Sequence, residues 1–305
     1  MLASAKKARQ WILRPQTLTG NYPDVAFGNG TFVAVSNTGN LLMSSTDGIS
    51  WTARSMPSGI TFASKAFYGN GLFVGVRISA NSNALGMTSP DGITWTARNL
   101  PVTGMSLTGG VYGNGLLVVF GGAANCMFTS TDGITWVQRT SLKNLWSGAC
   151  YGNGLFVVVA YYNSLSSTYP NQLVMTSPDG TNWTLRNTPQ GAWRNVAYGN
   201  GMFVATQNVA AGTTQGVMTS PDGINWTLRN TPNGTWNGIT YADGQFVALS
   251  SSGTGYRSMT SPDGITWTAR QTPADTAWSA IAFGKDRFVA VGDGRTTNNF
   301  VMTFE

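Results

Sequence analysis

A short repeat runs through almost the whole chain and constrains its fold more than any other feature. One signature is an aromatic residue followed by Gly-Asn-Gly-x-Phe-Val, and it alternates with a second signature, Ser-x-Asp-Gly-x-x-Trp. Copies of the first signature begin at Phe27, Tyr68, Tyr112, Tyr151, Tyr198, Tyr241 and Phe283. Because self-similarity at a period of about 40 to 47 residues is typical of propellers and solenoids, the repeat has to be interpreted before any local pattern.

The second signature has one copy fewer than the first. Its six Asp-Gly turns carry Asp47, Asp91, Asp132, Asp179, Asp222 and Asp263. The last unit stops at Phe300-Val-Met-Thr-Phe-Glu, where the earlier units continue into the Asp-Gly turn and its Trp-x-x-Arg strand. An unpaired Trp-Ile-Leu-Arg segment stands at residues 11–14, so the N-terminal segment is expected to supply the strand that the last unit lacks.

Each unit is expected to form four antiparallel strands. In the fifth unit, alternation and turn residues predict strands at 195–198, 202–207, 216–220 and 224–229. Asn-Gly between the first two strands favours a type I′ hairpin, which requires positive φ at both central residues. The prediction is an all-β, seven-bladed β-propeller at residues 11–305, with a tail at 1–10 and a seventh blade made of 278–305 plus 11–14.

These motifs resemble two groups of known repeat proteins. The Gly-Asn-Gly and Ser-Pro-Asp-Gly-x-x-Trp pattern is similar to repeats in bacteriophage tail-fibre and other virion β-propeller proteins. It is distantly similar to the Asp-box, or BNR, repeats of sialidase-like propellers, whose motif is Ser-x-Asp-x-Gly-x-Thr-Trp. All six copies here lack the residue between Asp and Gly, which argues against a sialidase relationship. The first resemblance implies a structural or attachment role in a virion.

The chain is poor in residues that carry catalysis. It has no histidine, and therefore no Ser-His-Asp or Cys-His arrangement and none of the commonest zinc ligand. Eight of its eleven aspartates belong to the two repeated turns, which leaves Asp24, Asp275 and Asp293, and its one glutamate is Glu305. A pair of catalytic carboxylates is hard to assemble from this set. The expectation is a protein without enzymatic activity, metal or cofactor.

The basic residues also follow the repeat. The net charge is +6 and the isoelectric point about 9.5. An arginine follows each outer-strand tryptophan by three residues, at Arg14, Arg54, Arg98, Arg139, Arg186, Arg229 and Arg270. On such a strand these arginines are expected to reach solvent or a neighbouring turn carboxylate while the tryptophan packs inward. Because the positive charge is spread around the ring, nucleic acid is not an expected partner.

Four further tryptophans precede the first signature by five residues. Separately, two cysteines occupy positions that hold mostly small or apolar residues in the other units. The tryptophans are Trp146, Trp193, Trp236 and Trp278. They are expected where the connection between blades enters the innermost strand, either as core packing or as an aromatic platform for sugar rings. Cys126 and Cys150 are expected to be buried free thiols.

The units differ most in the connections opposite the tight turns, where recognition residues usually lie on a rigid scaffold. The longest of these connections, at residues 161–171, carries Tyr161, Tyr162 and Tyr169 among Ser and Asn. Four arginines outside the repeated register, Arg77, Arg194, Arg257 and Arg295, are expected on the same face. Together with the four tryptophans, these are the candidate ligand-binding residues, and the six turn aspartates are interpreted as structural.

The functional hypothesis combines these observations. The first interpretation is a non-enzymatic tail-fibre, tail-tip or head-fibre propeller of a phage virion, which binds other virion proteins or a host surface glycan or protein. The alternative is a bacterial lectin-like or scaffold propeller that is not part of a virus. The N-terminal sequence has no apolar stretch typical of a signal peptide, and no segment reaches the length of a membrane span. Assembly in a host cytoplasm, without membrane insertion, is therefore expected.

Overall fold

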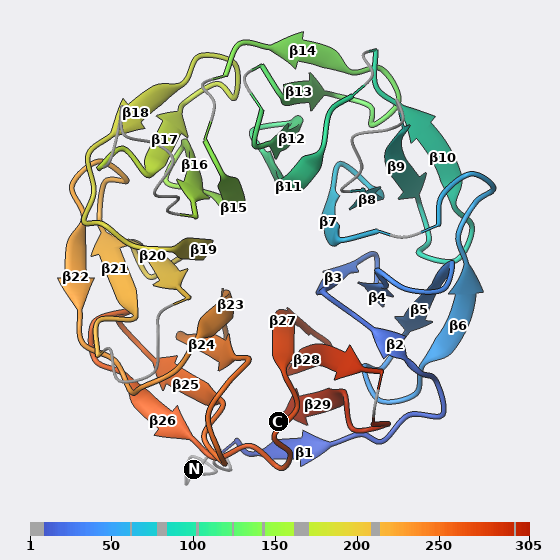
Figure 1. The fold of residues 1–305 in the computed structure, drawn as a ribbon, viewed down its shortest axis with the longest axis vertical. Helices are drawn as coiled ribbons and strands as arrows, with labels where there is room; N and C mark the ends of the chain where they lie inside the picture. The colour runs from blue at the N-terminus through green and yellow to red at the C-terminus, as the bar shows by residue number, and fades with distance from the viewer. Residues whose placement is uncertain are drawn as a thin grey trace, which may run out of the picture.

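The chain forms a ring of seven small antiparallel sheets around a central opening (Figure 1). The structure is a computed structural model that describes residues 9–61, 63–77, 84–101, 104–123, 125–141, 144–161, 171–208, 214–295 and 297–305. It confirms the all-β, seven-bladed propeller that the repeat predicts.

Six blades each contain four strands that are consecutive in the chain, from the innermost to the outermost. The strands are β3 (Asp24–Gly28), β4 (Thr31–Val35), β5 (Leu41–Ser45) and β6 (Thr52–Ser55) in blade 1; β7 (Lys65–Gly69), β8 (Leu72–Val76), β9 (Ala84–Ser89) and β10 (Thr96–Asn99) in blade 2; β11 (Leu107–Gly113), β12 (Leu116–Gly121), β13 (Met127–Ser130) and β14 (Val137–Arg139) in blade 3; β15 (Trp146–Gly152), β16 (Leu155–Ala160), β17 (Val174–Ser177) and β18 (Thr184–Arg186) in blade 4; β19 (Trp193–Gly199), β20 (Met202–Gln207), β21 (Val217–Ser220) and β22 (Thr227–Arg229) in blade 5; and β23 (Trp236–Ala242), β24 (Gln245–Ser250), β25 (Ser258–Ser261) and β26 (Thr268–Arg270) in blade 6.

The seventh blade is built from both ends of the chain. It contains β27 (Trp278–Gly284), β28 (Arg287–Gly294) and β29 (Val301–Phe304), and β1 (Trp11–Leu13) supplies its outermost strand, with the short β2 (Gly20–Asn21) pairing to the end of β28. Trp11 lies opposite Phe304 in the ladder, and their rings stack with centroids 4.9 Å apart. The N-terminal strand therefore closes the ring beside the C-terminus, as the unpaired Trp-x-x-Arg segment predicts (Figure 1).

The two repeated turns adopt the conformations that their residues favour. In the first hairpin of blade 5, Asn200 and Gly201 have φ of 48° and 76°, and the corresponding residues of the other blades also have positive φ. In the Asp-Gly turn of blade 3, Asp132 Oδ1 accepts hydrogen bonds from the backbone N–H groups of Ile134 and Thr135, both at 2.8 Å. These bonds satisfy the turn locally, so the aspartates have the structural role predicted for them.

Three strands of blade 5 differ from the predicted bounds, and the smallest difference is in β21, which begins at Val217, one residue late. β19 begins at Trp193, two residues before the expected start, because the ladder with β20 extends to a Trp193–Gln207 pair across a bulge. β22 begins at Thr227, three residues late. The backbone N–H groups of Ile224 and Asn225 are bonded to Asp222 Oδ1, so these residues belong to the turn rather than to the strand.

Adjacent blades approach closely at the innermost strands. A Cβ atom added to Gly28 would lie 2.0 Å from the ring of Tyr68 in the next blade, so only glycine fits between these two sheets. The same close approach recurs at Gly69, Gly113, Gly152, Gly199 and Gly284. The aromatic-Gly pair of the repeat therefore sets the spacing between blades as well as the hairpin.

The seven repeated arginines do not bind as the sequence suggests. In blade 4, Arg186 Nε donates to Thr176 Oγ1 of the third strand of the same blade at 2.9 Å, and equivalent bonds are made by Arg14, Arg54, Arg98, Arg139, Arg229 and Arg270. The sequence predicts that these arginines reach solvent or a turn carboxylate, but their Nε–H groups donate to a hydroxyl on the adjacent strand. The arginines hold the outer strand to its own sheet.

Candidate functional site

The two faces of the ring differ in how regular they are. The tight-turn face carries the first hairpins and the Asp-Gly turns, because both turns follow strands that run in the same direction across the ring. The loop face carries the connections between second and third strands and the connections between blades. The tight-turn face is nearly the same in every blade, whereas residue types differ from blade to blade on the loop face.

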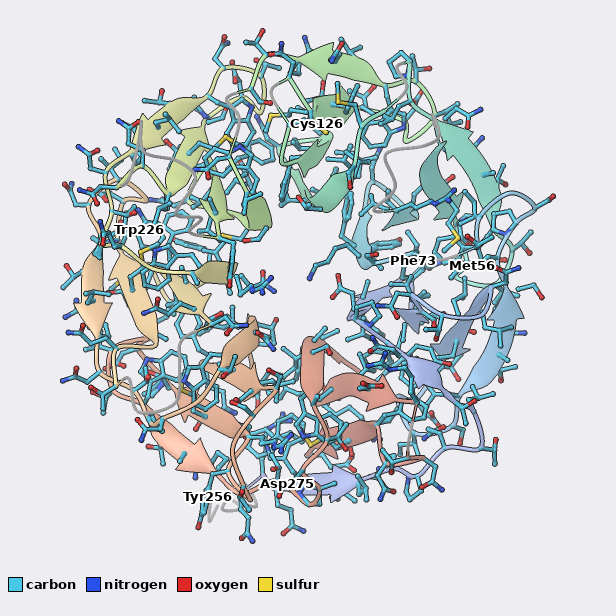
Figure 2. All side chains as sticks on the ribbon, viewed as in Figure 1. Met56, Phe73, Cys126, Trp226, Tyr256 and Asp275 are labelled. Carbon is cyan, nitrogen blue, oxygen red and sulfur yellow. The ribbon has the colours of Figure 1, made fainter. Side chains whose placement is uncertain are left out.

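A hollow opens on the loop face where the innermost strands begin. This channel mouth is a cavity of about 470 Å³ lined by Lys65, Thr108, Leu145, Trp146, Ser147, Tyr161, Arg194, Asn208, Asn237 and Ser279. It adjoins the central channel, a further cavity of about 430 Å³ between the innermost strands, with which it shares Lys65 and Ser147. Figure 2 shows side chains projecting into this central opening from several blades.

Arg194 and Tyr161 meet at the channel mouth. The guanidinium carbon of Arg194 lies 4.2 Å from the centroid of the Tyr161 ring, which is a cation–π contact. Arg194 Nε is buried and has no hydrogen-bond acceptor within the described part of the chain. Arg194 also takes part in none of the ion pairs found among those residues. The sequence predicts both residues as ligand-binding candidates, and the structure brings them together.

Lys65 reaches the same hollow from the other side of the ring. It begins β7, which lies across the central opening from β19 (Figure 1). Lys65 Nζ is 3.9 Å from Asp24 Oδ2, and this oxygen also accepts a bond from the backbone N–H of Ala66 at 3.0 Å. Burial raises the pKa of Asp24, against the opposing effects of Lys65 and of the N–H groups of Ala66 and Val25. Asp24 therefore joins blade 1 to blade 2.

Hydroxyl groups at the channel mouth are already bonded between blades. Thr108 Oγ1 donates to the carbonyl of Trp146, and Ser147 Oγ donates to the carbonyl of Trp193 at 2.7 Å. Each bond joins one innermost strand to the next. These two hydroxyls therefore donate within the ring, whereas Lys65 and Arg194 bring two cationic side chains to the lining of the hollow.

The four tryptophans form part of the core. Their exposed fractions are 1% for Trp146 and 0% for Trp193, Trp236 and Trp278. The indole Nε1 atoms of Trp193, Trp236 and Trp278 donate to the carbonyls of Pro189, Pro232 and Ala274 in the preceding connections. The alternative of a sugar-stacking platform is wrong for these rings, because a platform needs an accessible ring face. They pack the start of each innermost strand instead.

Three of the candidate arginines lie away from the channel mouth. Arg77 Nη1 donates to the carbonyl of Gly59, and Arg295 is paired with Asp293 at 2.6 Å. Arg257 donates to backbone carbonyls of its own loop and lies 3.5 Å from Asp275, which Figure 2 places at the outer edge of the ring. The candidates Tyr162 and Tyr169 fall outside the described residues.

Several residues of the channel mouth were not predicted from sequence. Lys65 was missed because no tryptophan marks the start of the innermost strand in blade 2. Thr108, Ser147, Asn237 and Ser279 correspond to Arg194 in their own blades, one position after the buried residue that begins each strand. Alignment of the repeats at that position provides the signal that would have found them.

The described residues also bear on other kinds of site. Among them, no cluster of three or more histidine, cysteine, aspartate or glutamate side chains could hold a metal ion. The same residues contain no helix of the length and apolar character needed to cross a membrane. Cys126 is a buried free thiol, as predicted, and burial raises its pKa to about 11. Cys150 is also a free thiol, but the prediction that it is buried is wrong, because it lines the central channel and is half-buried.

Comparisons with known proteins support the fold. Neither the protein-family models nor the curated proteins contain a match to this chain. Similar solved structures include YCF48 bound to D1 peptide, with a TM-score of 0.68, 16% identity and 98% of each chain covered. A catalytically inactive histidine-to-alanine variant of virginiamycin B lyase from Staphylococcus aureus with quinupristin has a TM-score of 0.78 and 12% identity, covering 97% of this chain and 99% of the lyase.

A third similar structure is the WD40 domain of Neurospora crassa Pan2, with a TM-score of 0.68, 10% identity, and coverage of 98% of this chain and 96% of that domain. None of these three structures is of a virion protein or a sialidase. At such low identities the likeness concerns the propeller fold alone, and the fold hosts many unrelated functions.

Proposed function

We propose that this propeller is a non-enzymatic binding protein that holds a partner on its loop face, over the channel mouth. The observation that carries the proposal is the convergence of Lys65, Tyr161 and Arg194 on one hollow of about 470 Å³. These residues come from three different blades, and they break the symmetry that the repeat imposes elsewhere. Recognition residues held on a rigid scaffold are the usual basis of a binding site.

Two observations favour binding over catalysis. The chain has no histidine, whereas the similar lyase structure is of a variant inactivated by replacing a histidine. Among the described residues that line the channel, Asp24 is the one carboxylate, and it already accepts two backbone hydrogen bonds. Another similar propeller, YCF48, was solved with a bound peptide, which makes a protein partner a reasonable choice for this chain.

A photo-crosslinking amino acid placed on each face tests the proposal. Leu145 lines the channel mouth with 40% of its surface exposed, and Ile134 is 55% exposed in an Asp-Gly turn of the tight-turn face. The two positions therefore form a matched pair of exposed apolar residues. We expect the Leu145 probe to crosslink a partner in a lysate of the source organism and the Ile134 probe to give none. Equal crosslinking from both positions would contradict a loop-face site.

We propose further that the partner belongs to a phage virion or to the surface of its host. The support for this finer proposal is the resemblance of the Gly-Asn-Gly and Ser-Pro-Asp-Gly-x-x-Trp repeats to those of virion propellers. Peptide mass spectrometry across a density gradient of a lysate tests it. Co-sedimentation with DNA-filled particles at fixed stoichiometry is expected. Recovery only in the free protein fractions would favour a scaffold or lectin-like propeller outside a virus.

A further inference from the structure

We propose that the channel mouth binds a carboxylate group of a peptide partner, with Arg194 as its principal ligand. This inference rests on the proposed function and names the chemistry of the group that enters the hollow. Its starting point is Arg194 Nε, a buried donor with no acceptor within the described residues. A buried donor without a partner is unfavourable, and a ligand oxygen that accepts its N–H would remove that penalty.

The orientation of Arg194 is fixed in advance. Its guanidinium lies on the Tyr161 ring at 4.2 Å, so the side chain is held at the wall of the hollow and not free in solvent. A guanidinium presents a planar set of N–H donors that matches the two oxygens of a carboxylate. Since Arg194 is in none of the ion pairs found among the described residues, its charge is available to a ligand.

The charge balance of the hollow favours a single negative charge. Lys65 contributes a second cation, but Asp24 lies 3.9 Å from Lys65 Nζ and offsets much of that charge. The remaining excess is about one positive charge, which suits a carboxylate better than a doubly charged phosphate. Leu145 and the Tyr161 ring supply apolar surface beside the cation, which suits a peptide side chain next to the carboxylate.

The same hollow is poorly equipped for a neutral sugar. The hydroxyl protons of Thr108 and Ser147 are bonded to carbonyls of the next blade. Arg194 occupies one face of the Tyr161 ring, and the Trp146 ring is buried. A sugar would therefore find few free donors and little aromatic surface to stack on.

Three N-acetylated tripeptides provide the test. Acetyl-Gly-Leu-Gly with a free terminus carries a main-chain carboxylate, acetyl-Gly-Leu-Glu amide carries a side-chain carboxylate, and acetyl-Gly-Leu-Gln amide carries neither. Each is titrated into the nitrogen-15-labelled full chain while the arginine Nε–H signals are followed by NMR. The signal of Arg194 is assigned by its loss in the Arg194→Gln variant. Inorganic phosphate is titrated as the competing oxyanion.

We expect a carboxylate peptide to shift the Arg194 signal and the uncharged peptide to leave it unmoved. The Arg194→Gln variant should bind that peptide about tenfold or more weakly, as loss of a charged hydrogen-bond donor implies. The matched control is Arg295→Gln, since Arg295 is 60% exposed on the loop face and paired with Asp293. Its affinity for the peptide should not change. Circular dichroism confirms that both variants are folded.

Equal binding of the uncharged peptide, tighter binding of phosphate, or unchanged affinity in Arg194→Gln would each overturn the carboxylate assignment. The two proposals can fail separately. If the Leu145 probe crosslinks a partner while no carboxylate peptide shifts Arg194, the carboxylate inference is wrong and the loop-face site stands. If Leu145 gives no crosslink, the loop-face site itself is wrong.

Discussion

The tight-turn face and the loop face are built from the same seven units but use their polar residues differently. On the tight-turn face, Asn29 Nδ2 donates to the carbonyl of Pro90 in the next blade, and Asn200 makes the same contact with Pro262, both at 3.3 Å. On the loop face, one equivalent position is Arg194 in blade 5, Ser147 in blade 4 and Asn237 in blade 6. The tight-turn face thus repeats the same contact between blades, whereas the loop face carries a different residue at the equivalent position of each of these blades.

At the junction between blades 6 and 7, the tight-turn face keeps a contact between neighbouring blades although the residues that make it differ. There Asp243 takes the place of the hairpin asparagine, and its Oδ2 lies 2.6 Å from Arg9 Nη2. Arg9 also donates to the carbonyl of Phe304 at 2.9 Å. An ion pair thus replaces the neutral contact at the one junction where the two ends of the chain meet. The repeat therefore fixes the contacts of the tight-turn face and lets residue types vary on the loop face, where we propose the binding site.

The largest effect is expected from opening the ring. Deletion of residues 1–14 removes β1, exposes the Phe304 ring and breaks the Arg9–Asp243 pair. Loss of the buried Trp11 ring alone is expected to cost about 4 kcal/mol in the free energy of unfolding. Calorimetry should show a sharply lower melting temperature, partly restored by a peptide of residues 9–14 added in trans. Unchanged melting would mean that the N-terminal strand does not close the ring.

A cumulative effect is expected in acid. Hydrogen bonds from the backbone N–H groups of Thr135 and Ile134 lower the pKa of Asp132 to about 2, and the pKa of Asp179 is also lowered, chiefly by the N–H of Asn182. A depressed pKa contributes stability above the unfolded value of about 3.9, and that stability is lost as the pH falls through the folded pKa. Urea unfolding from pH 7 to pH 2 should show this loss below about pH 4. A flat profile would contradict the structural role of these carboxylates.

A smaller effect is expected from a single turn. Asp91 accepts hydrogen bonds from the backbone N–H groups of Ile93 and Thr94 at 2.8 Å, so Asp91→Ala should lower the free energy of unfolding by about 1 kcal/mol. The loop-face counterpart is Asp293→Ala, which breaks an exposed pair with Arg295 and one longer backbone hydrogen bond, from the N–H of Arg295 at 3.1 Å, and should cost less, about 0.5 kcal/mol. Urea denaturation measures both. An equal cost for the two variants would remove the distinction between the faces.

The smallest effect on stability is expected at the channel mouth. Arg186 Nε is bonded to Thr176, and Arg186→Gln should cost about 1 kcal/mol. Arg194 Nε has no partner among the described residues, so Arg194→Gln should change the free energy of unfolding by less than about 0.5 kcal/mol. A larger loss in Arg194→Gln than in Arg186→Gln would place Arg194 with the architectural residues.

Much of the fold follows from sequence because its determinants are local. Positive φ at Asn200 and Gly201, and the bonds to Asp132, depend on residues within one turn. The hydroxyl that each repeated arginine binds was not predicted, because it lies on another strand of the blade and no pattern within the turn or the outer strand identifies it. Closure of the ring could be predicted because the strand that the last unit lacks matches the unpaired segment near the N-terminus.

The candidate site was only partly predictable. Tyr161 stood out because it begins the longest loop, and Arg194 because it lies outside the register of the repeated arginines, but their contact joins residues from two blades. Lys65 reaches the same hollow from across the ring, and no local pattern encodes that convergence. The tryptophans looked equally suited to a core or a platform, and only the exposed fraction of each ring distinguishes the two.

Hydrogen–deuterium exchange of the chain with and without its crosslinked partner tests the central claim most directly. The account predicts slower exchange in peptides that cover the loop-face starts of β15 and β19, at Leu145–Gly148 and Trp193–Asn195, with no change in the Asp-Gly turns around Asp132 and Asp179. Protection confined to the Asp-Gly turns would contradict it, because the partner would then lie on the face that the repeat commits to architecture.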